Sequence, residues 1–173
     1  DDAIAVFMRD AIARLNRDDV PLKGIFHSAA ALSMAPILDL DDARIAEMFH
    51  PKVVGTEVLE RVTRDTGLDF LVLFSTTTAL LGASGLAHYA AANAFMDAFA
   101  VANDGPSRRV MSVNWGTWEV MRLVDEQTRR RYMEGGLLPM PTVDALAALG
   151  GLLAEPRPNA VVASVDWRVL KSL

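Results

Sequence analysis

The chain has 173 residues, enough for one domain or for one piece of a larger domain. Hydrophobic residues make up 51% of the chain and charged residues 23%, so it can bury a core and is not a disordered segment. A net charge of −5 without a basic block argues against an electrostatic nucleic-acid binder, and the lack of cysteine excludes disulfides, thiolate metal sites and a cysteine nucleophile.

Helical and strand-like segments alternate along the chain. In chain order they are a helix over 4–15, a strand over 22–27, a helix over 41–66, a strand over 70–74, a helix over 88–103, a strand over 109–114, a helix over 142–153 and a strand over 160–163. Pro51 is expected to kink or split the second helix, and Gly67 to close it. After Trp118 we expect an irregular segment, followed by a helix that Thr142 caps.

This alternation predicts the fold class. Strands separated by helices favour βαβ units and a mostly parallel sheet. The continuous apolar run Phe70-Leu71-Val72-Leu73-Phe74 is typical of a strand that helices cover on both faces. We therefore expect an α/β fold, a three-layer sandwich of Rossmann type, with a single domain over residues 1–173.

Polar side chains follow the predicted strands, where ligands bind in parallel α/β sheets. Tyr89 and Asn93 are four residues apart at the start of a helix, so both project from one face. Thr76 stands thirteen residues before Tyr89, and its hydroxyl and the phenol can reach one carbonyl oxygen. A nearby lysine such as Lys52 would favour the phenolate, lower the pKa of the tyrosine and make it a usable acid near neutrality.

Four motifs form a specific combination. They are Pro51-Lys52-Val53-Val54-Gly55, Phe74-Ser75-Thr76-Thr77-Thr78-Ala79-Leu80-Leu81-Gly82, Tyr89-Ala90-Ala91-Ala92-Asn93-Ala94-Phe95-Met96-Asp97-Ala98 and Asn114-Trp115-Gly116-Thr117-Trp118. Together they resemble the ketoreductase domain of modular type I polyketide synthases, a branch of the short-chain dehydrogenase/reductases. Free-standing members place a lysine four residues after the tyrosine, whereas the synthase domains place an asparagine there and supply the lysine from the preceding helix. Lys52, Tyr89 and Asn93 match that exchanged arrangement.

The resemblance implies NADPH-dependent reduction of a β-ketoacyl thioester, carried on an acyl carrier protein, to the β-hydroxyacyl thioester. Tyr89 would give the proton, and Lys52 would lower the pKa of the tyrosine and hold a ribose hydroxyl of the cofactor. Asn93 would help to fix the lysine and a proton-relay water, and Thr76 would help to polarise the ketone. The cofactor-binding residues that it implies are Lys52, Tyr89, His27, Ser28, Ala29, Trp115 and Gly116.

Three departures from the family pattern are visible. The usual serine is Thr76 here, which keeps the donor but adds a methyl group and stiffens χ1. Leu32-Ser33-Met34 stands where many members have Leu-Asp-Asp, and Leu81 where others have a tryptophan, so neither stereochemical marker is present. There is no Gly-x-Gly-x-x-Gly phosphate loop. We therefore expect the C-terminal catalytic half of the domain, without the N-terminal βαβ units and with that upstream half as a partner.

Two other functions remain open at this stage. One is a catalytically inactive, reductase-like module that scaffolds neighbouring synthase domains. Thr76 and the missing glycine loop favour this function, and the intact Lys52, Tyr89 and Asn93 oppose it. The other is a free-standing reductase of small ketones, which Asn93 opposes.

The remaining expectations concern metals, partners and location. The three histidines lie far apart without metal-ligand spacing, so we expect no metal site. No uninterrupted apolar run is long enough to span a membrane, and the N-terminus lacks a basic region and an initiator methionine, so we expect neither a span nor a signal peptide. We expect a cytoplasmic protein that binds no nucleic acid and contacts an acyl carrier protein and neighbouring synthase domains.

Overall fold

The computed structural model describes residues 2–15, 20–120, 125–155 and 157–172. Its helical elements are α1 (Asp2–Leu15), a 3₁₀ turn η2 (Ile37–Asp39), α2 (Asp42–Phe49), a π-helical turn η3 (His50–Val54), α3 (Gly55–Thr63), α4 (Thr78–Leu81), α5 (Ala87–Asn103), α6 (Glu126–Glu134), α7 (Thr142–Ala154) and α8 (Trp167–Leu170). Its strands are β1 (Gly24–His27), β2 (Phe70–Thr76), β3 (Arg109–Trp115), β4 (Leu137–Leu138), β5 (Asn159–Val162) and β6 (Ser164–Val165). Each predicted helix or strand corresponds to an element of that type.

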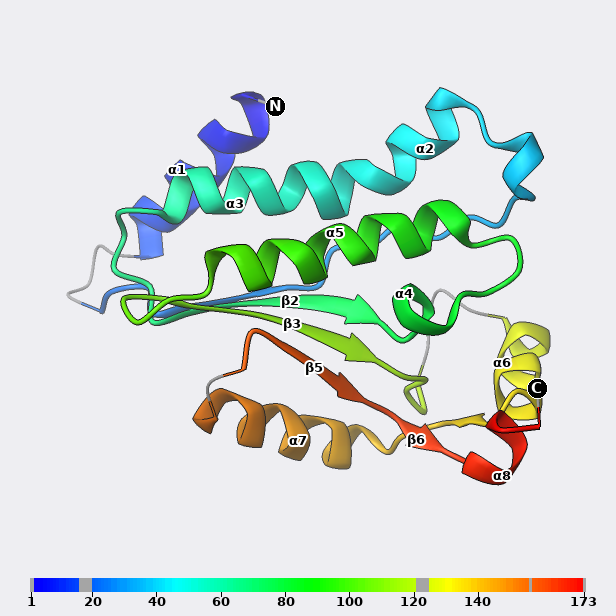
Figure 1. Ribbon diagram of the computed structural model, residues 1–173. Helices are drawn as coiled ribbons and strands as arrows, with labels where there is room; N and C mark the ends of the chain where they lie inside the picture. The colour runs from blue at the N-terminus through cyan, green and yellow to red at the C-terminus, as the bar shows by residue number, and fades with distance from the viewer. Residues whose placement is uncertain (1, 16–19, 121–124, 156, 173) are drawn as a thin grey trace.

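The main sheet has four parallel strands in the order β1-β2-β3-β5. In Figure 1, α1, α3 and α5 lie on one side of this sheet and α7 lies on the other, so helices and sheet form three layers. Strands β4 and β6 pair antiparallel in a separate two-stranded ribbon near α6 and α8. The predicted α/β sandwich of Rossmann type is confirmed.

Two apolar clusters hold the layers together. On the side of α3 and α5 the buried residues are Leu59, Leu71, Leu73, Met96, Ala100 and Val110. On the side of α7 they are Val72, Met111, Val113, Trp115, Met140, Ala145 and Leu149. Neighbouring residues of β2 therefore point into opposite clusters, because side chains alternate along a strand.

The long predicted helix changes character at Pro51. The chain stays helical from α2 into α3, but Pro51 lies in the π-helical turn η3 between them. Proline lacks the N–H that an α-helix needs at this point, and a wider turn is one way to accommodate the loss. The expected closure by Gly67 is wrong, since α3 ends at Thr63 and Gly67 adopts a φ of +69° in the turn that follows.

Two expectations after Trp118 need correction. The segment expected to be irregular contains α6 and β4, because Asp125 caps α6 by accepting a hydrogen bond from the Thr128 N–H at 2.7 Å. Thr142 is the first residue of α7 and not its cap. Its N–H instead donates to the Glu119 carboxylate at 2.8 Å, so a side chain from outside the helix satisfies that donor.

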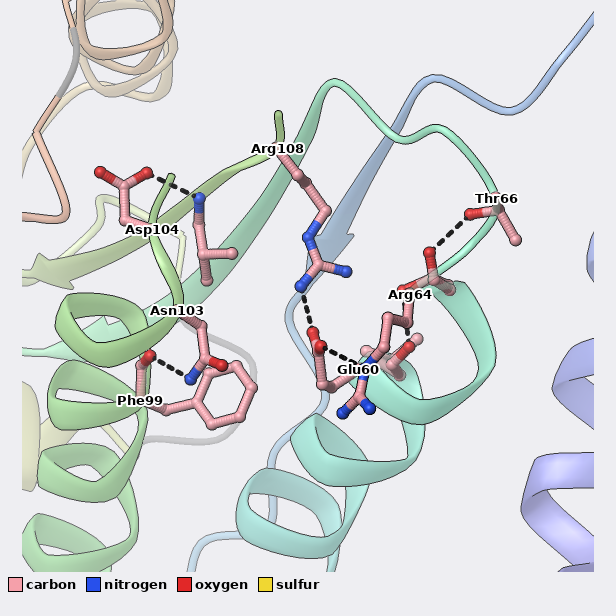
Figure 2. A network of polar contacts seen from close by, with 10 residues as sticks. Glu60, Arg64, Thr66, Phe99, Asn103, Asp104 and Arg108 are labelled. Atoms are coloured by element: carbon pink, nitrogen blue, oxygen red, sulfur yellow. Dashed lines mark hydrogen bonds and ion pairs between the residues drawn. The ribbon is translucent and has the colours of Figure 1, made fainter. Parts of the chain in front are cut away.

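A polar network joins the layers at the amino ends of the strands, away from the predicted site. Figure 2 shows Glu60 of α3 between Arg64 and Arg108, with Arg108 at the entry to β3. The Glu60 carboxylate accepts hydrogen bonds from both guanidinium groups. At the end of α5, Asp104 forms an ion pair with Arg109 at 2.8 Å. These contacts fix how α3 and α5 meet the sheet.

Candidate active site

The structure brings the four predicted catalytic side chains to the carboxyl end of β2. Lys52 comes from η3, Thr76 ends β2, and Tyr89 and Asn93 lie on the first turns of α5. A cavity of about 60 Å³ is lined by Thr76 and Tyr89, together with Leu32 from the segment after β1. The three segments that carry the site are therefore adjacent in space, although 37 residues separate Lys52 from Tyr89 in the sequence.

Lys52 is almost completely buried, with 2% of its surface exposed. Its Nζ donates a hydrogen bond to the carbonyl of Phe74 at 3.0 Å and lies 5.7 Å from the centroid of the Tyr89 ring. Burial lowers the pKa of Lys52 to about 8, and the negative charge of Asp97 acts in the opposite direction. The lysine can therefore exchange its proton near neutral pH.

The pKa of Tyr89 is raised, mainly because the phenol is buried and secondly because Tyr132 lies nearby. Hydrogen bonding by the Thr76 and Asn93 side chains acts in the opposite direction. Burial therefore outweighs the groups that favour the phenolate, and the ammonium group of Lys52 bonds to the main-chain carbonyl of Phe74. The expected lowering of this pKa by Lys52 stays a prediction. Tyr89 carries its proton at neutral pH.

Thr76 is held in the turn that follows β2. Its Oγ1 donates to the hydroxyl of Thr78 at 3.3 Å and accepts from the Thr78 N–H at 3.2 Å. These contacts fix the position of the hydroxyl oxygen where the chain leaves the sheet, while the O–H can rotate toward another acceptor. The threonine thus keeps a positioned hydroxyl at the place where the family usually has serine.

Asn93 is completely buried beneath Tyr89. Its amide nitrogen donates to the main-chain carbonyl of Tyr89 at 2.7 Å. Its Oδ1 is buried and has no hydrogen-bond partner within the described parts of the chain. An unpaired buried acceptor costs stability, so this oxygen is suited to a donor from a bound molecule.

Among the residues expected to bind a cofactor, His27 is 8% exposed. It is buried behind Lys52, and burial together with the charge of Lys52 lowers its pKa. The ring approaches Gly55 so closely that an added Cβ there would lie 3.2 Å from the His27 Cε1. Ser28 and Ala29 follow β1 at the carboxyl end of the sheet, and both are exposed.

Trp115 and Gly116 lie at the end of β3. Both border the cavity, but the indole ring of Trp115 packs in the α7-side core, 5.4 Å from the Phe74 ring and 4.9 Å from the Trp118 ring. At Gly116 an added Cβ would lie 2.8 Å from the Cβ of Ala163. Glycine is therefore required for the close approach of β3 to the segment after β5.

Two residues of this region were not singled out from the sequence. Asp97 follows Asn93 by four residues on α5 and bonds to Ser112 and Asn114 of β3. Tyr132 of α6 lines the same cavity as Tyr89. Asp97 could have been found from the sequence, because Tyr89, Asn93 and Asp97 follow one another at intervals of four residues. Tyr132 could not, because the helix α6 that carries it was not expected.

Other regions of the described structure contribute less to a site. A larger cavity of about 340 Å³ lies at the amino ends of β2 and β3 and contains none of the predicted site residues. Within the described ranges, no group of three His, Asp or Glu side chains is placed to hold a metal ion. No helix there is long and apolar enough to cross a membrane.

Comparisons with known proteins agree with this arrangement. Residues 3–120 match the family model described as the KR domain. A spectinabilin polyketide synthase system protein of Streptomyces orinoci is 37% identical over 155 residues, which cover 87% of this chain and 4% of the relative. The mycoketide-CoA synthase of Mycobacterium tuberculosis is 31% identical over 170 residues, covering 94% of this chain and 4% of the relative. The chain thus spans only a small part of the length of these relatives.

Solved structures place the fold in the same family. The ketoreductase from the first module of phoslactomycin biosynthesis in Streptomyces sp. HK803 superposes with a TM-score of 0.87 at 30% identity, over 96% of this chain and 38% of that one. A structure of A-type ketoreductases from a modular polyketide synthase gives a TM-score of 0.82 at 34% identity, over 94% of this chain and 35% of that one. The chain belongs to the ketoreductase domains of modular polyketide synthases, within the short-chain dehydrogenase/reductase superfamily.

Proposed function

We propose that this chain is the catalytic part of a reductase that uses NADPH to reduce a β-ketoacyl thioester on an acyl carrier protein to the β-hydroxyacyl thioester. The observation that carries the proposal is the meeting of Lys52, Thr76 and Tyr89 at one end of β2, with Asn93 beneath them. Family membership supports a nicotinamide cofactor and ketoreduction in polyketide assembly. The choice of NADPH and of a carrier-bound substrate belongs to the proposal.

In the proposed reaction Thr76 and Tyr89 bind the ketone oxygen through their hydroxyl groups. Both side chains line one small cavity, so a single carbonyl oxygen can lie between them. The phenol oxygen of Tyr89 carries the proton at neutral pH, because burial raises its pKa. As negative charge develops on the ketone oxygen, that proton passes from the phenol to the substrate.

The residues present fit the nicotinamide end of the cofactor. Lys52 offers a buried ammonium group, and the buried Oδ1 of Asn93 needs a donor such as a hydroxyl or a water. When bound, NADPH supplies the hydride for the carbonyl carbon. Lys52 stabilises the phenolate that Tyr89 becomes after it gives up its proton. A water held by Asn93 then relays a proton back to the phenolate.

The rest of the cofactor site is assigned to a further, upstream part of the domain. The free edge of β1 has no paired strand among the described residues, and Phe26 remains 47% exposed. Its ring contacts Phe70 at 5.3 Å and Phe74 at 6.4 Å between centroids, forming an aromatic strip on the α7 side of the sheet. Covering this strip and edge would give the sheet two complete faces.

If an upstream part of the domain covers this aromatic strip, Phe26 is buried in the complete domain. In the complete domain Phe26→Asp should lower the free energy of unfolding by about 3 kcal/mol or more, because a carboxylate would replace a buried ring. A neutral effect in the complete domain, measured by denaturant unfolding, would mean that this face stays exposed.

The reaction is tested by NADPH oxidation in the full polypeptide that contains these residues. A short β-ketoacyl thioester should be reduced by the wild type and not by Tyr89→Phe, which keeps the ring but removes the proton donor. If the wild type neither oxidises nor binds NADPH, the chain acts as an inactive structural module of the synthase. If it binds NADPH without turnover, the threonine at position 76 or the choice of substrate is at fault, and Thr76→Ser distinguishes these two causes.

A further inference from the structure

The side chain of Lys52 enters the candidate active site from a helical element other than the one that carries Tyr89. Lys52 belongs to the π-helical turn η3, whereas Tyr89 lies on α5. Two residues of one helix keep a fixed spacing, but the distance between Lys52 and Tyr89 depends on how η3 directs the lysine. Some feature of η3 must therefore set the direction of this side chain.

The main chain of η3 departs from an α-helix on both sides of Lys52. Pro51 has no N–H, so it cannot donate to the carbonyl four residues before it, as an α-helix requires. The Gly55 N–H donates to the carbonyl of His50, which is five residues earlier, as well as to that of Lys52. Such a wider turn inside a helix is rare and frequently lies at a functional site.

The hydroxyl of Thr56 bonds to the same carbonyl of Lys52. Its Oγ1 donates to the Lys52 oxygen at 2.5 Å, and the side chain is completely buried. A threonine hydroxyl that bonds to the carbonyl four residues before it often bends a helix. The Lys52 carbonyl therefore has two donors, the Gly55 N–H and the Thr56 hydroxyl, which hold the main chain of the lysine at this bend.

Contacts with two strands hold the turn against the sheet. An added Cβ at Gly55 would lie 3.3 Å from the His27 Nε2, so the absent side chain leaves room for the ring at the end of β1. Lys52 Nζ donates to the carbonyl of Phe74 at 3.0 Å, near the end of β2. Because Thr56 holds its main chain and β2 holds its Nζ, the lysine is fixed at both ends.

We propose that Thr56 is a positioning residue for Lys52: its hydroxyl holds the π-helical turn in the form that directs the ammonium group to the Tyr89 ring. The ammonium nitrogen lies 5.7 Å from the centroid of that ring. The proposal rests on the function proposed above, in which Lys52 stabilises the phenolate of Tyr89. Thr56 does not line the cavity beside Tyr89, so it acts through the lysine and not on the substrate.

The chain contains a matched control for this hydroxyl. Thr63 lies on the same helix α3, is also completely buried, and donates from its Oγ1 to the carbonyl of Leu59, again four residues earlier, at 2.6 Å. Thr56→Val and Thr63→Val therefore lose the same kind of hydrogen bond, but only the first loses it at Lys52. Both should lower the stability of the fold by a similar amount, whereas only Thr56→Val should move the lysine. Thr56→Ser keeps the hydroxyl and should leave the lysine in place.

The position of Lys52 is read in the full polypeptide from the reaction of its amine with trace acetic anhydride, followed by mass spectrometry of the peptide that contains it. Lys52 is 2% exposed, so its amine is shielded in the wild type. Lys23, with 57% of its side chain exposed, is the internal reference. Relative to Lys23, acetylation of Lys52 should be several-fold faster in Thr56→Val and unchanged in Thr63→Val and Thr56→Ser.

Catalysis supplies the second readout. The phenolate forms only as the proton leaves Tyr89, so a displaced ammonium group should weaken binding of the transition state more than binding of the substrate. In Thr56→Val both kcat and kcat/KM for a short β-ketoacyl thioester should fall roughly ten- to a hundredfold, because a misplacement of about 1 Å can cost ~10²-fold. Thr63→Val and Thr56→Ser should keep both constants.

The outcomes separate this positioning role from the proposed reaction. Faster acetylation in Thr56→Val alone, in a protein whose wild type never reduces the thioester, supports the positioning of the lysine and overturns the reaction. Equal acetylation in the two valine variants, or an unchanged kcat in Thr56→Val of an active protein, overturns the positioning role. If Thr56→Val does not fold, Pro51→Ala takes its place, since it restores the missing N–H and lets the turn tighten. Faster acetylation and a lower kcat are then expected, and no change in either contradicts the proposal.

Discussion

The ammonium nitrogen of Lys52 lies 5.7 Å from the centroid of the Tyr89 ring and donates its hydrogen bond to the carbonyl of Phe74. The lysine is thus beside the phenol ring but anchored to β2. Burial raises the pKa of Tyr89 and leaves the phenol protonated, as a proton donor requires, while the lysine is close enough to stabilise the phenolate once the proton has left.

The buried lysine should make stability depend on pH. Its pKa is about 8 in the folded chain against 10.5 in the reference state, so the unfolded chain holds more protons between these two values. The free energy of unfolding should therefore rise as pH increases from about 8 toward 10. Lys52→Met should remove this rise and stabilise the fold at neutral pH by up to about 3 kcal/mol.

The control for that measurement is Lys23→Met. Lys23 is an exposed lysine whose side chain forms a surface ion pair with Asp69. Lys23→Met should leave the pH dependence of the free energy of unfolding unchanged, as measured by denaturant unfolding at several pH values. A pH dependence in Lys52→Met equal to that of the wild type would mean that Lys52 is not the group that titrates.

The ion pair between Glu60 and Arg108, at the amino ends of the strands, should contribute strongly to stability. Glu60 and Arg108 form an ion pair with side chains only 12% and 14% exposed. Glu60→Leu should cost about 3–5 kcal/mol, because it leaves the guanidinium group buried without its partner. Glu126→Leu, at a pair with Arg130 that is 79% and 72% exposed, should change stability by less than about 1 kcal/mol. Equal losses in chemical denaturation would contradict the role of burial.

Alanine substitutions at Gly116 and Gly150 should change the stability of the fold in opposite directions. Gly116→Ala places a Cβ 2.8 Å from the Cβ of Ala163 and should destabilise the fold by about 1–3 kcal/mol. Gly150 lies inside α7 with open space around it, so Gly150→Ala should stabilise the helix by about 0.5–1 kcal/mol. Thermal unfolding of the two variants measures both changes in stability. Adding Ala163→Gly should restore part of the stability that Gly116→Ala loses.

The buried oxygen of Asn93 predicts a cofactor effect that can be measured without turnover. Asn93→Leu removes the unpaired acceptor and fills its space with apolar atoms. The variant also loses the hydrogen bond from the Asn93 amide to the Tyr89 carbonyl, so its stability should stay close to that of the wild type. It should bind NADPH several-fold more weakly, because a bound molecule or its water loses a partner. Fluorescence titration with NADPH checks this, and unchanged affinity would mean that the oxygen faces no ligand.

Much of the fold follows from local patterns in the sequence. The strand over 70–74 and the helix over 88–103 are long and periodic, and the alternation of helices with strands allows few other topologies. The motifs around Lys52, Tyr89 and Asn93 identify the candidate residues, and helical spacing places Tyr89 and Asn93 on the same side of α5. These features depend on residues close in the chain.

The features that sequence reasoning missed depend on contacts between distant segments. The network of Asp97 with Ser112 and Asn114 requires the register of β3 and the packing of α5 against it. The helix α6 was missed because Gly135, Gly136 and Pro139 suggested disruption, although they lie after its end. Trp115 faces the core because Met111, Val113 and Trp115 alternate onto the α7 side of β3.

Reduction of a β-keto group by these residues can be followed directly by the transfer of deuterium from the cofactor. The full polypeptide is incubated with a β-ketoacyl thioester and NADPH that carries deuterium at the transferable position, and the product is analysed by mass spectrometry. We expect a β-hydroxyacyl thioester with one deuterium on the β-carbon in the wild type and none of this product with Tyr89→Phe. Equal product from both proteins, or an unlabelled β-carbon in the wild type, would contradict the proposed reduction.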